Sequence, residues 1–274
     1  MTKEVAFSLL LLLVAPPGAQ ERGAAPLPVV TRADKEAFLL KANVVDEGDT
    51  TTGSKFWRVT LDDGTRKHDA AIETSTLHDA SQRDYRFNVA AYELDKALEL
   101  NFVAPSVERA MKGQPAAFTW WVDDVLMNEQ GRRGKKIEPP DPDSWKKQMQ
   151  DVRVFDELIA NAYRNVSPEF YLAGIWDNLL ITKEWKIWLV DHTRAFGAGR
   201  KLENPETLAQ CDRALLSRLR QLTKKVTKQR LGKYLTPAQL DALEVRRGLI
   251  VKHFAEQIAR KGEGAVLYDL PSRR

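Results

Sequence analysis

An asparagine and an aspartate flank a short pair of hydrophobic segments in the second half of the chain. Asn178 precedes the first segment, Asp191 follows the second, and a tight hairpin turn is expected at Lys183 and Glu184. Because the two strands of a hairpin begin and end at the same edge, we expect Asn178 and Asp191 to lie side by side. An amide oxygen beside a carboxylate suits Mg²⁺ or Mn²⁺ and leaves positions for substrate phosphates. The spacing predicts a metal site; the alternative is that Asp191 bonds only the local backbone.

Three residues next to this pair carry further polar groups. Asp177 is another oxygen donor, but we expect its side chain on the face opposite Asn178, because adjacent strand residues alternate between faces. His192 is expected to form structural hydrogen bonds rather than to act as a base, and Arg194 to pair with a nearby carboxylate.

Two groups of residues between Val154 and Phe196 form a recognisable pattern. They are Asn161, Arg164 and Asn165, followed by Asn178, Trp185, Trp188 and the run Asp191, His192, Thr193, Arg194, Ala195, Phe196. The pattern resembles the catalytic core of bacterial proteins with an atypical kinase fold, HipA-like or phosphatidylinositol-kinase-like. In protein kinases an Asn and a following Asp hold the metal ions. The resemblance extends more weakly over residues 41–269.

The resemblance implies an α+β, two-lobed protein-kinase-like fold. Its N-lobe would be an antiparallel sheet plus a helix, and its C-lobe would be mainly helical. It also implies ATP as a second cofactor beside Mg²⁺ or Mn²⁺, and phosphoryl transfer to a hydroxyl acceptor on protein, lipid or sugar.

The chain departs from the family pattern at the catalytic loop. Tyr163 stands where a kinase has its catalytic Asp, and a phenol with a pKa of ~10 is a poor base at neutral pH. An extra run, residues 166–176, follows the loop. Arg164 and Asn165 remain the catalytic-loop candidates, to position the loop or contact phosphate; the alternative is a helix end with a solvated arginine. These departures predict weakened activity.

The ATP-binding half also departs from the pattern. The third strand should carry a phosphate-binding Lys paired with a helix Glu, but those positions are Glu73 and Asn88. Lys41, Arg58 or, as a further candidate, Lys67 could supply the missing positive charge.

Two adjacent tryptophans stand where the hinge between the lobes is expected. Trp121 is the candidate to stack on the adenine ring. At most one of Trp120 and Trp121 can do so, because adjacent strand residues face opposite sides. Packing in the core is the alternative for both.

The order of the predicted elements agrees with two lobes. Strand-like runs over 38–48, 55–64 and 65–75 precede a helical pattern over 84–100 and strands over 103–113 and 116–126, so 38–127 is the predicted N-lobe. Residues 128–144 are polar and Pro-rich and predict a loop. Helical patterns over 148–161, 205–231 and Pro237–Lys261 place the C-lobe at 145–270, with Thr236 as an N-cap.

The amino-terminal segment predicts export. Residues 5–15 are apolar, follow Lys3, and precede small and turn-forming residues. This is typical of a secretory signal peptide cleaved near Ala19, with 20–37 as a linker and a periplasmic or extracellular destination. The run is too short for a stable transmembrane span, and an N-terminal membrane anchor is the alternative.

Composition narrows the classes of partner. The net charge of +4 is mild and the basic residues are spread through the predicted helices, so no nucleic-acid partner is expected.

Cys211 is the single cysteine, which excludes an intrachain disulfide, and it is expected to be an inert residue in a helical stretch. The motifs of serine hydrolases and zinc proteases are absent.

These patterns predict an exported kinase-fold protein with a magnesium–ATP site and weakened phosphotransferase activity, either a pseudokinase or a slow kinase. The alternative is a non-catalytic binding or scaffolding module that uses the cleft between the lobes. The expected scarcity of ATP outside the cytoplasm favours this alternative.

Overall fold

A computed structural model describes residues 30–48, 57–74, 84–161, 164 and 175–271. The chain divides into a unit Met1–Thr31 and a unit Arg32–Arg274, and the second is described below. The predicted signal peptide, most of the linker, Tyr163, Asn165 and nearly all of the predicted insertion lie outside the described residues.

Five strands form an antiparallel sheet in the order β1-β2-β3-β5-β4. Their bounds are β1 Asn43–Glu47, β2 Trp57–Asp62, β3 Lys67–Thr74, β4 Ser106–Met111 and β5 Gln114–Trp120. The Asp-Gly signal after β2 is confirmed as a hairpin, in which Gly64 has φ 86° and its N–H donates to the Asp62 carboxylate at 2.7 Å. The β2–β3 pair is thus a local hairpin, as the sequence predicts, whereas β3 pairs with β5 although residues 75–113 lie between them in the chain.

The first predicted strand, residues 38–48, is partly helical, which corrects the prediction. Helix α1 spans Arg32–Lys41, and β1 begins only at Asn43. Phe38, Leu39 and Ala42 pack on one face of the sheet while Leu40 and Lys41 are exposed. A short apolar run such as Phe-Leu-Leu fits either a helix or a strand, and burial against the sheet selected the helix.

Helix α2, Arg86–Leu98, confirms the helix predicted between the third and fourth strands. It contacts β4 and β5. Tyr85 and Val89, at its beginning, form a small apolar cluster with Ala117 of β5.

The predicted strand over 116–126 is two strands that belong to different sheets. Strand β5 ends at Trp120, and β6, Val125–Asn128, pairs instead with β7, Leu179–Thr182, which pairs with β8, Ile187–Leu189. Asp124 has φ 53°, which breaks the extended backbone between them. Residues 121–124 therefore connect the two sheets.

Residues 128–144 are partly helical and not a loop throughout. Helix α3 spans Glu129–Gly134 and α4 spans Pro142–Ile159. Asn128 and Asp141 cap the two helices with their side chains, and Pro142 occupies the first turn of α4. The polar and Pro-rich composition that indicated a loop therefore includes two helix starts, with the non-helical residues 135–141 between the helices.

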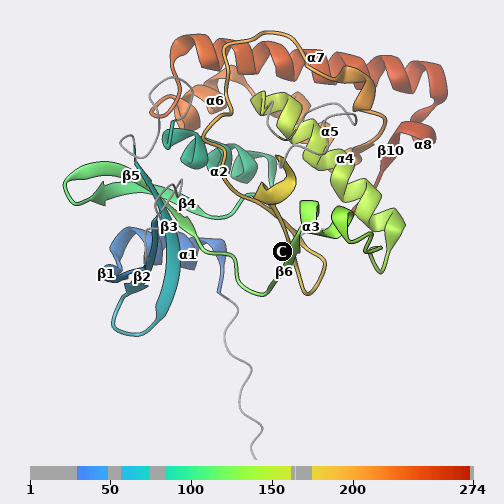
Figure 1. The fold of residues 1–274 in the computed structure, drawn as a ribbon. Helices are drawn as coiled ribbons and strands as arrows, with labels where there is room; N and C mark the ends of the chain where they lie inside the picture. The colour runs from blue at the N-terminus through green and yellow to red at the C-terminus, as the bar shows by residue number, and fades with distance from the viewer. Residues whose placement is uncertain (1–29, 49–56, 75–83, 162–163, 165–174, 272–274) are drawn as a thin grey trace, which may run out of the picture. The chain divides into compact units, whose positions relative to one another are not determined.

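The remaining elements are mostly helices (Figure 1). They are the 3₁₀ helices η3 Ile175–Asn178 and η4 Pro205–Thr207, the helices α5 Arg213–Gln221, α6 Lys224–Leu231, α7 Pro237–Lys261 and α8 Glu263–Val266, and the strands β9 Cys211–Asp212 and β10 Leu267–Tyr268. Thr236 caps α7 in a capping box, as predicted. The helical pattern over 205–231 is interrupted, so Cys211 lies buried in a short strand and not in a helix.

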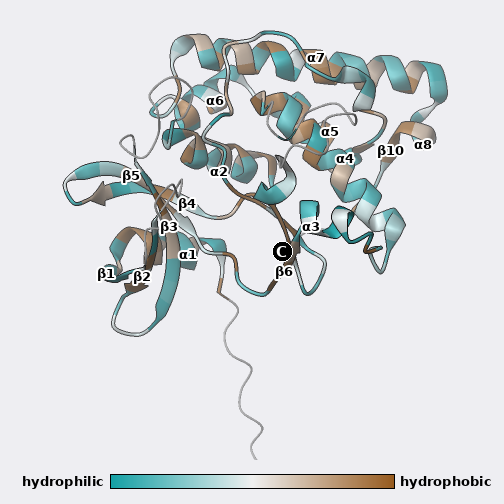
Figure 2. Ribbon diagram, viewed as in Figure 1, coloured by the Kyte–Doolittle hydropathy of each residue, from teal (hydrophilic) through white to brown (hydrophobic). Residues whose placement is uncertain are grey.

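Hydrophobic and hydrophilic residues alternate along α4, α5 and α7, and their apolar sides form a large core with α2 and the β7–β8 hairpin (Figure 2). The fold class is therefore the predicted one: an antiparallel sheet with helices α1 and α2, and a mainly helical second lobe. The domain limits 38–127 and 145–270 stay a prediction. None of the described helices is long and apolar enough to cross a membrane.

The second lobe also touches the first at a place distant in sequence from residues 121–124. Tyr234, between α6 and α7, packs against the cluster of Tyr85, Val89 and Ala117. Lys233 forms an ion pair with Glu108 of β4, and the Tyr85 hydroxyl donates to the same carboxylate at 3.2 Å.

Candidate active site

A cavity of about 730 Å³ lies where the five-stranded sheet, residues 121–125 and the β7–β8 hairpin meet. Its size is typical of a site for a small molecule. The walls include Arg58, Ala71, Glu73, Asn88, Thr119, Trp120, Trp121, Val122, Asp123, Asp124, Val125, Asp177, Asn178, Leu180, Val190 and Asp191. The cavity thus collects most of the predicted site residues that the structure describes.

The structure brings Asn178 and Asp191 together, as the hairpin spacing predicts. The Val190 N–H donates to the Asn178 carbonyl at 3.1 Å, and Asn178 Nδ2 donates to Asp191 Oδ2 at 3.4 Å. The other carboxylate oxygen of Asp191 accepts from the Thr193 hydroxyl at 2.5 Å. Their convergence on the cavity is a structural fact, whereas metal binding stays a prediction.

Two details of this hairpin differ from prediction. The turn covers residues 183–186 rather than Lys183 and Glu184 alone, with Trp185 at φ 57°. Asp177 lines the cavity together with Asn178 instead of facing away. It lies in the 3₁₀ helix η3, where the side-chain alternation of a strand does not apply.

The donor set can be compared with the needs of a metal ion. Among the described residues no three His, Cys, Asp or Glu side chains gather to hold one. Mg²⁺, however, is commonly held by one or two protein ligands together with waters and substrate phosphates. Asp191 offers a carboxylate, and rotation of the Asn178 amide would present Oδ1 on the side that now carries Nδ2. This pair fits a magnesium ion that shares its coordination with phosphates.

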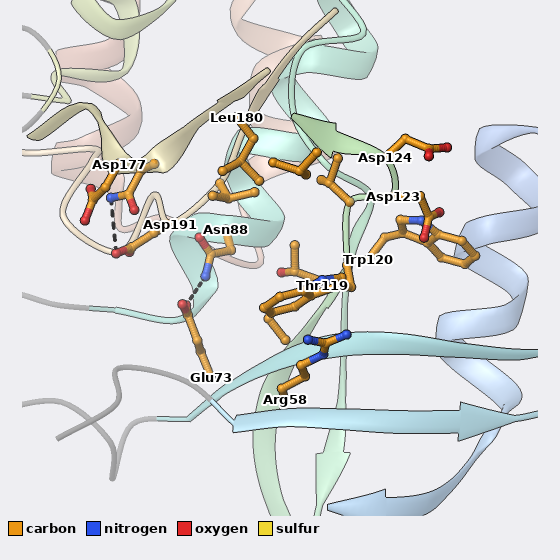
Figure 3. A pocket seen from close by; sticks show the side chains of 16 residues that line it. Arg58, Glu73, Asn88, Thr119, Trp120, Asp123, Asp124, Asp177, Leu180 and Asp191 are labelled. Carbon is orange, nitrogen blue, oxygen red and sulfur yellow. Dashed lines mark hydrogen bonds between the residues drawn. The ribbon is translucent and has the colours of Figure 1, made fainter. Parts of the chain in front are cut away.

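Glu73 and Asn88, at the positions of the expected Lys–Glu pair, are in contact. Asn88 Nδ2 donates to Glu73 Oε2, and Asn88 Oδ1 accepts from the His192 N–H at 2.7 Å. Both side chains are buried, at 5% and 3% exposure. Figure 3 shows Glu73 and Asn88 pointing toward one another. The sequence identified both positions but not the bond to His192.

The candidate nucleotide-binding residues separate into two groups. Arg58 and Trp121 line the cavity, with the guanidinium carbon 4.3 Å from the ring centroid and Arg58 Nη2 2.6 Å from Asp69 Oδ2. Lys41 is not among the lining residues, because it ends helix α1 on the exposed side. Trp120 packs in the core under α1, stacked on His68 with centroids 3.5 Å apart.

Arg164 is buried, which excludes the solvated arginine, and it is not among the residues that line the cavity, so its contact with phosphate stays a prediction. It pairs with Asp156, with Nη2 3.0 Å from Oδ1, and its Nη1 donates to the Val190 carbonyl at 3.0 Å. Burial raises the pKa of Asp156, and the charge of Arg164 offsets part of that effect. Arg164 therefore anchors the backbone just before Asp191.

His192 is buried next to Phe155, and its Nε2 has no hydrogen-bond partner among the described residues. Burial, with a smaller contribution from the charge of Arg164, holds the pKa of His192 well below its ordinary value. The expected structural hydrogen bond of His192 comes from its backbone N–H, which donates to Asn88 Oδ1.

Carboxylates dominate the described wall. They come from Glu73, Asp123, Asp124, Asp177 and Asp191, whereas the positive charge comes from Arg58. Asp177 and Asp191 lie at one end of the cavity and Asp123 and Asp124 at the other (Figure 3). Asp123 contacts His68 Nε2 at 2.9 Å, and Asp124 pairs with Lys183 at 2.9 Å. An anionic ligand would need cations to enter this site.

Sequence reasoning missed the apolar walls, which include Ala71, Leu180 and Val190. Leu180 and Val190 lie two residues after Asn178 and one residue before Asp191, so their proximity to that pair could have revealed them. Asp123 and Asp124 were treated as part of a strand and were also missed.

Comparison with known proteins supports the fold and gives no family. No family model and no curated protein matches the chain. The structure of hydra Fam20 with sugar is similar with a TM-score of 0.63 and 14% identity, over 86% of this chain and 92% of that one. The Helicobacter pylori proinflammatory kinase CtkA is similar with a TM-score of 0.52 and 9% identity, over 82% of this chain and 98% of that one. The chain has a kinase-like α+β fold.

Proposed function

We propose that this chain is an exported kinase-fold protein that binds a magnesium–ATP complex and has weakened phosphotransferase activity. The observation that carries the proposal is the pairing of Asn178 with Asp191 at one end of the 730 Å³ cavity. The likeness to a named kinase agrees with it. The finer assignment to HipA-like proteins rests on the sequence pattern alone.

Different walls of the cavity would bind the nucleobase and the metal ion. Ala71, Leu180 and Val190 provide apolar surface for a nucleobase, and Trp121 provides an aromatic face. Asn178 and Asp191 would hold the metal ion near the phosphates. When bound, the ion supplies positive charge that bridges phosphate oxygens and stabilises charge that develops during transfer.

Two substitutions support weakened rather than full activity. Glu73 places a carboxylate where a kinase places a phosphate-binding lysine, and Tyr163 replaces the catalytic carboxylate. A phosphate group near Glu73 would be repelled, so binding would depend on the metal ion more strongly than in a typical kinase.

The acceptor would be a hydroxyl on protein, lipid or sugar. A sugar hydroxyl has support from the similar hydra Fam20 structure, which contains a sugar. Export, with the mature chain beginning near Gln20, rests on the amino-terminal sequence.

Thermal unfolding tests the proposal most directly. We expect ATP with Mg²⁺ or Mn²⁺ to raise Tm, ATP with a chelator to have little effect, and Asp191→Ala to lose the metal-dependent rise. Absence of stabilisation by any nucleotide–metal combination in the parent chain would reject the nucleotide site. It would favour the non-catalytic binding module, which the acidic wall of the cavity also favours.

A further inference from the structure

Asn88 lies between the cavity and the backbone that carries Asp191. We propose that Asn88 is a positioning residue for Asp191, acting through the His192 N–H and held by Glu73. The inference rests on the proposed function, because it concerns how the metal-binding aspartate is oriented.

Two hydrogen bonds fix the orientation of the Asn88 amide. The His192 N–H can only donate, so it must face Oδ1, and this leaves Nδ2 to donate to the Glu73 carboxylate. A flipped amide would lose both bonds. Asn88 is 3% exposed and Glu73 5%, so water has little access to replace either partner.

The backbone at Asp191 needs such support. Asp191 has φ 49°, a left-handed conformation that is unfavourable for residues other than glycine. Arg164 holds the Val190 carbonyl at 3.0 Å before it, and Asn88 holds the His192 N–H at 2.7 Å after it. The bond from Asn88 therefore fixes the peptide that directly follows the metal-binding residue.

Asn88 also links this peptide to two other elements. It lies in helix α2, and Glu73 lies in strand β3. In protein kinases a Lys–Glu pair joins the same two elements and contacts phosphate. Here the carboxylate–amide pair keeps the link between strand and helix but directs it toward the backbone after Asp191, away from a phosphate.

Exchanging the carboxylate of Glu73 and the amide of Asn88 between the two positions can preserve both hydrogen bonds of Asn88. In Asn88→Ala both bonds are lost. In Asn88→Asp the bond to His192 can persist, but two buried carboxylates face each other. In the double variant Glu73→Gln/Asn88→Asp, the Gln amide can donate to the Asp carboxylate, which still accepts from His192. The net charge equals that of the parent.

The test uses the full chain and two measurements. The first is the affinity for Mn²⁺, measured by electron paramagnetic resonance of the free ion. The second is the hydrogen-exchange rate of the His192 amide without metal, measured by NMR. Gln150→Ala is the control, because Gln150 Oε1 is a buried amide oxygen that accepts from the Ala209 and Gln210 N–H groups at 3.3 and 3.4 Å and is not among the residues that line the cavity.

We expect Asn88→Ala to weaken Mn²⁺ binding about 10–100-fold, the range for groups that orient metal ligands, and to accelerate exchange at His192. Asn88→Asp should also weaken binding, and the double variant should recover affinity to within about 3-fold of the parent. Gln150→Ala should change Tm but neither measurement.

Two outcomes would overturn the inference. One is unchanged exchange and Mn²⁺ affinity in folded Asn88→Ala, and the other is a double variant no better than Asn88→Asp. If the parent binds no Mn²⁺ and no nucleotide, the proposed function fails. The exchange rate at His192 still decides whether Asn88 holds this backbone.

Discussion

The Asn178 amide and the Asp191 carboxylate meet 3.4 Å apart at one end of a cavity, although their positions in the chain differ by 13. A hairpin holds them there, so a metal ion bound by one is within reach of the other.

Asp191→Ala should remove metal-dependent nucleotide binding. A ligand present at 100 times its Kd adds about 2.7 kcal/mol to the free energy of unfolding, and we expect the variant to lose most of this. Urea unfolding with and without ATP and Mg²⁺ measures this loss, and calorimetric titration measures the affinity. Glu206→Ala, an exposed acidic residue that is not among the cavity's lining residues, is the matched control, and equal affinity in both variants would contradict the assignment.

Glu73→Gln should raise the affinity for ATP when no divalent cation is present. The variant removes one negative charge from the wall, and a Gln oxygen can still accept from Asn88 Nδ2. An effect of about 10-fold is expected for a unit charge at this range. Equilibrium binding in a chelator measures it, and unchanged or weaker binding would show that the phosphates do not lie near Glu73.

Tyr163→Asp should raise ATP turnover only slightly. A general base is typically worth ~10²–10⁴-fold, but the phosphate-binding lysine would still be missing. Turnover is compared between parent and variant, each also carrying Asp191→Ala. Strong turnover in the parent that Asp191→Ala abolishes would show that the catalytic centre is intact.

The Tyr85 hydroxyl should lose its proton at a higher pH than an ordinary tyrosine, and its protonated form should stabilise the fold at moderately alkaline pH. Burial, with the charge of Glu108, raises the pKa of Tyr85 from 10.0 to about 12. Because the folded pKa is the higher one, the contribution is complete below pH 10 and is lost as pH rises through about 12. Phenolate absorbance of the parent and Tyr85→Phe, followed against pH, checks this. Titration of Tyr85 near 10 would refute it.

Arg164→Met should destabilise the fold strongly. It leaves the Asp156 carboxylate buried without its partner, which typically costs about 3–5 kcal/mol. Replacing both residues, as in Arg164→Met/Asp156→Leu, should cost less. Urea unfolding of the two variants gives the comparison, and equal losses would mean that the bond to Val190 matters more than the ion pair.

The sequence predicts the fold class and the main site pair because both depend on local spacing. The hairpin that carries Asn178 and Asp191 needs only its own residues, and so does the capping box at Thr236. The link from Asn88 to His192 joins residues 104 apart. No pattern within a single stretch of sequence indicates a contact between residues so far apart.

The wrong and missing predictions have separate physical causes. A helix was missed at Lys41 because three apolar residues suit a helix as well as a strand until burial against the sheet decides. Asp177 was placed on the wrong face because alternation was assumed in a 3₁₀ helix. The ion pair of Arg164 with Asp156 was not predicted, because an arginine gives no sign in sequence of the buried carboxylate it will meet.

The contact of Tyr234 with the first lobe, distant in sequence from residues 121–124, has a kinetic consequence. If residues 121–124 were the sole connection, the lobes could move apart freely, but every further contact between them must break before they separate. Wide opening of the cavity would require Tyr234 to leave the cluster of Tyr85 and Val89, and Lys233 to leave Glu108. The residence time of a bound molecule would then depend on the strength of a contact that the molecule never touches.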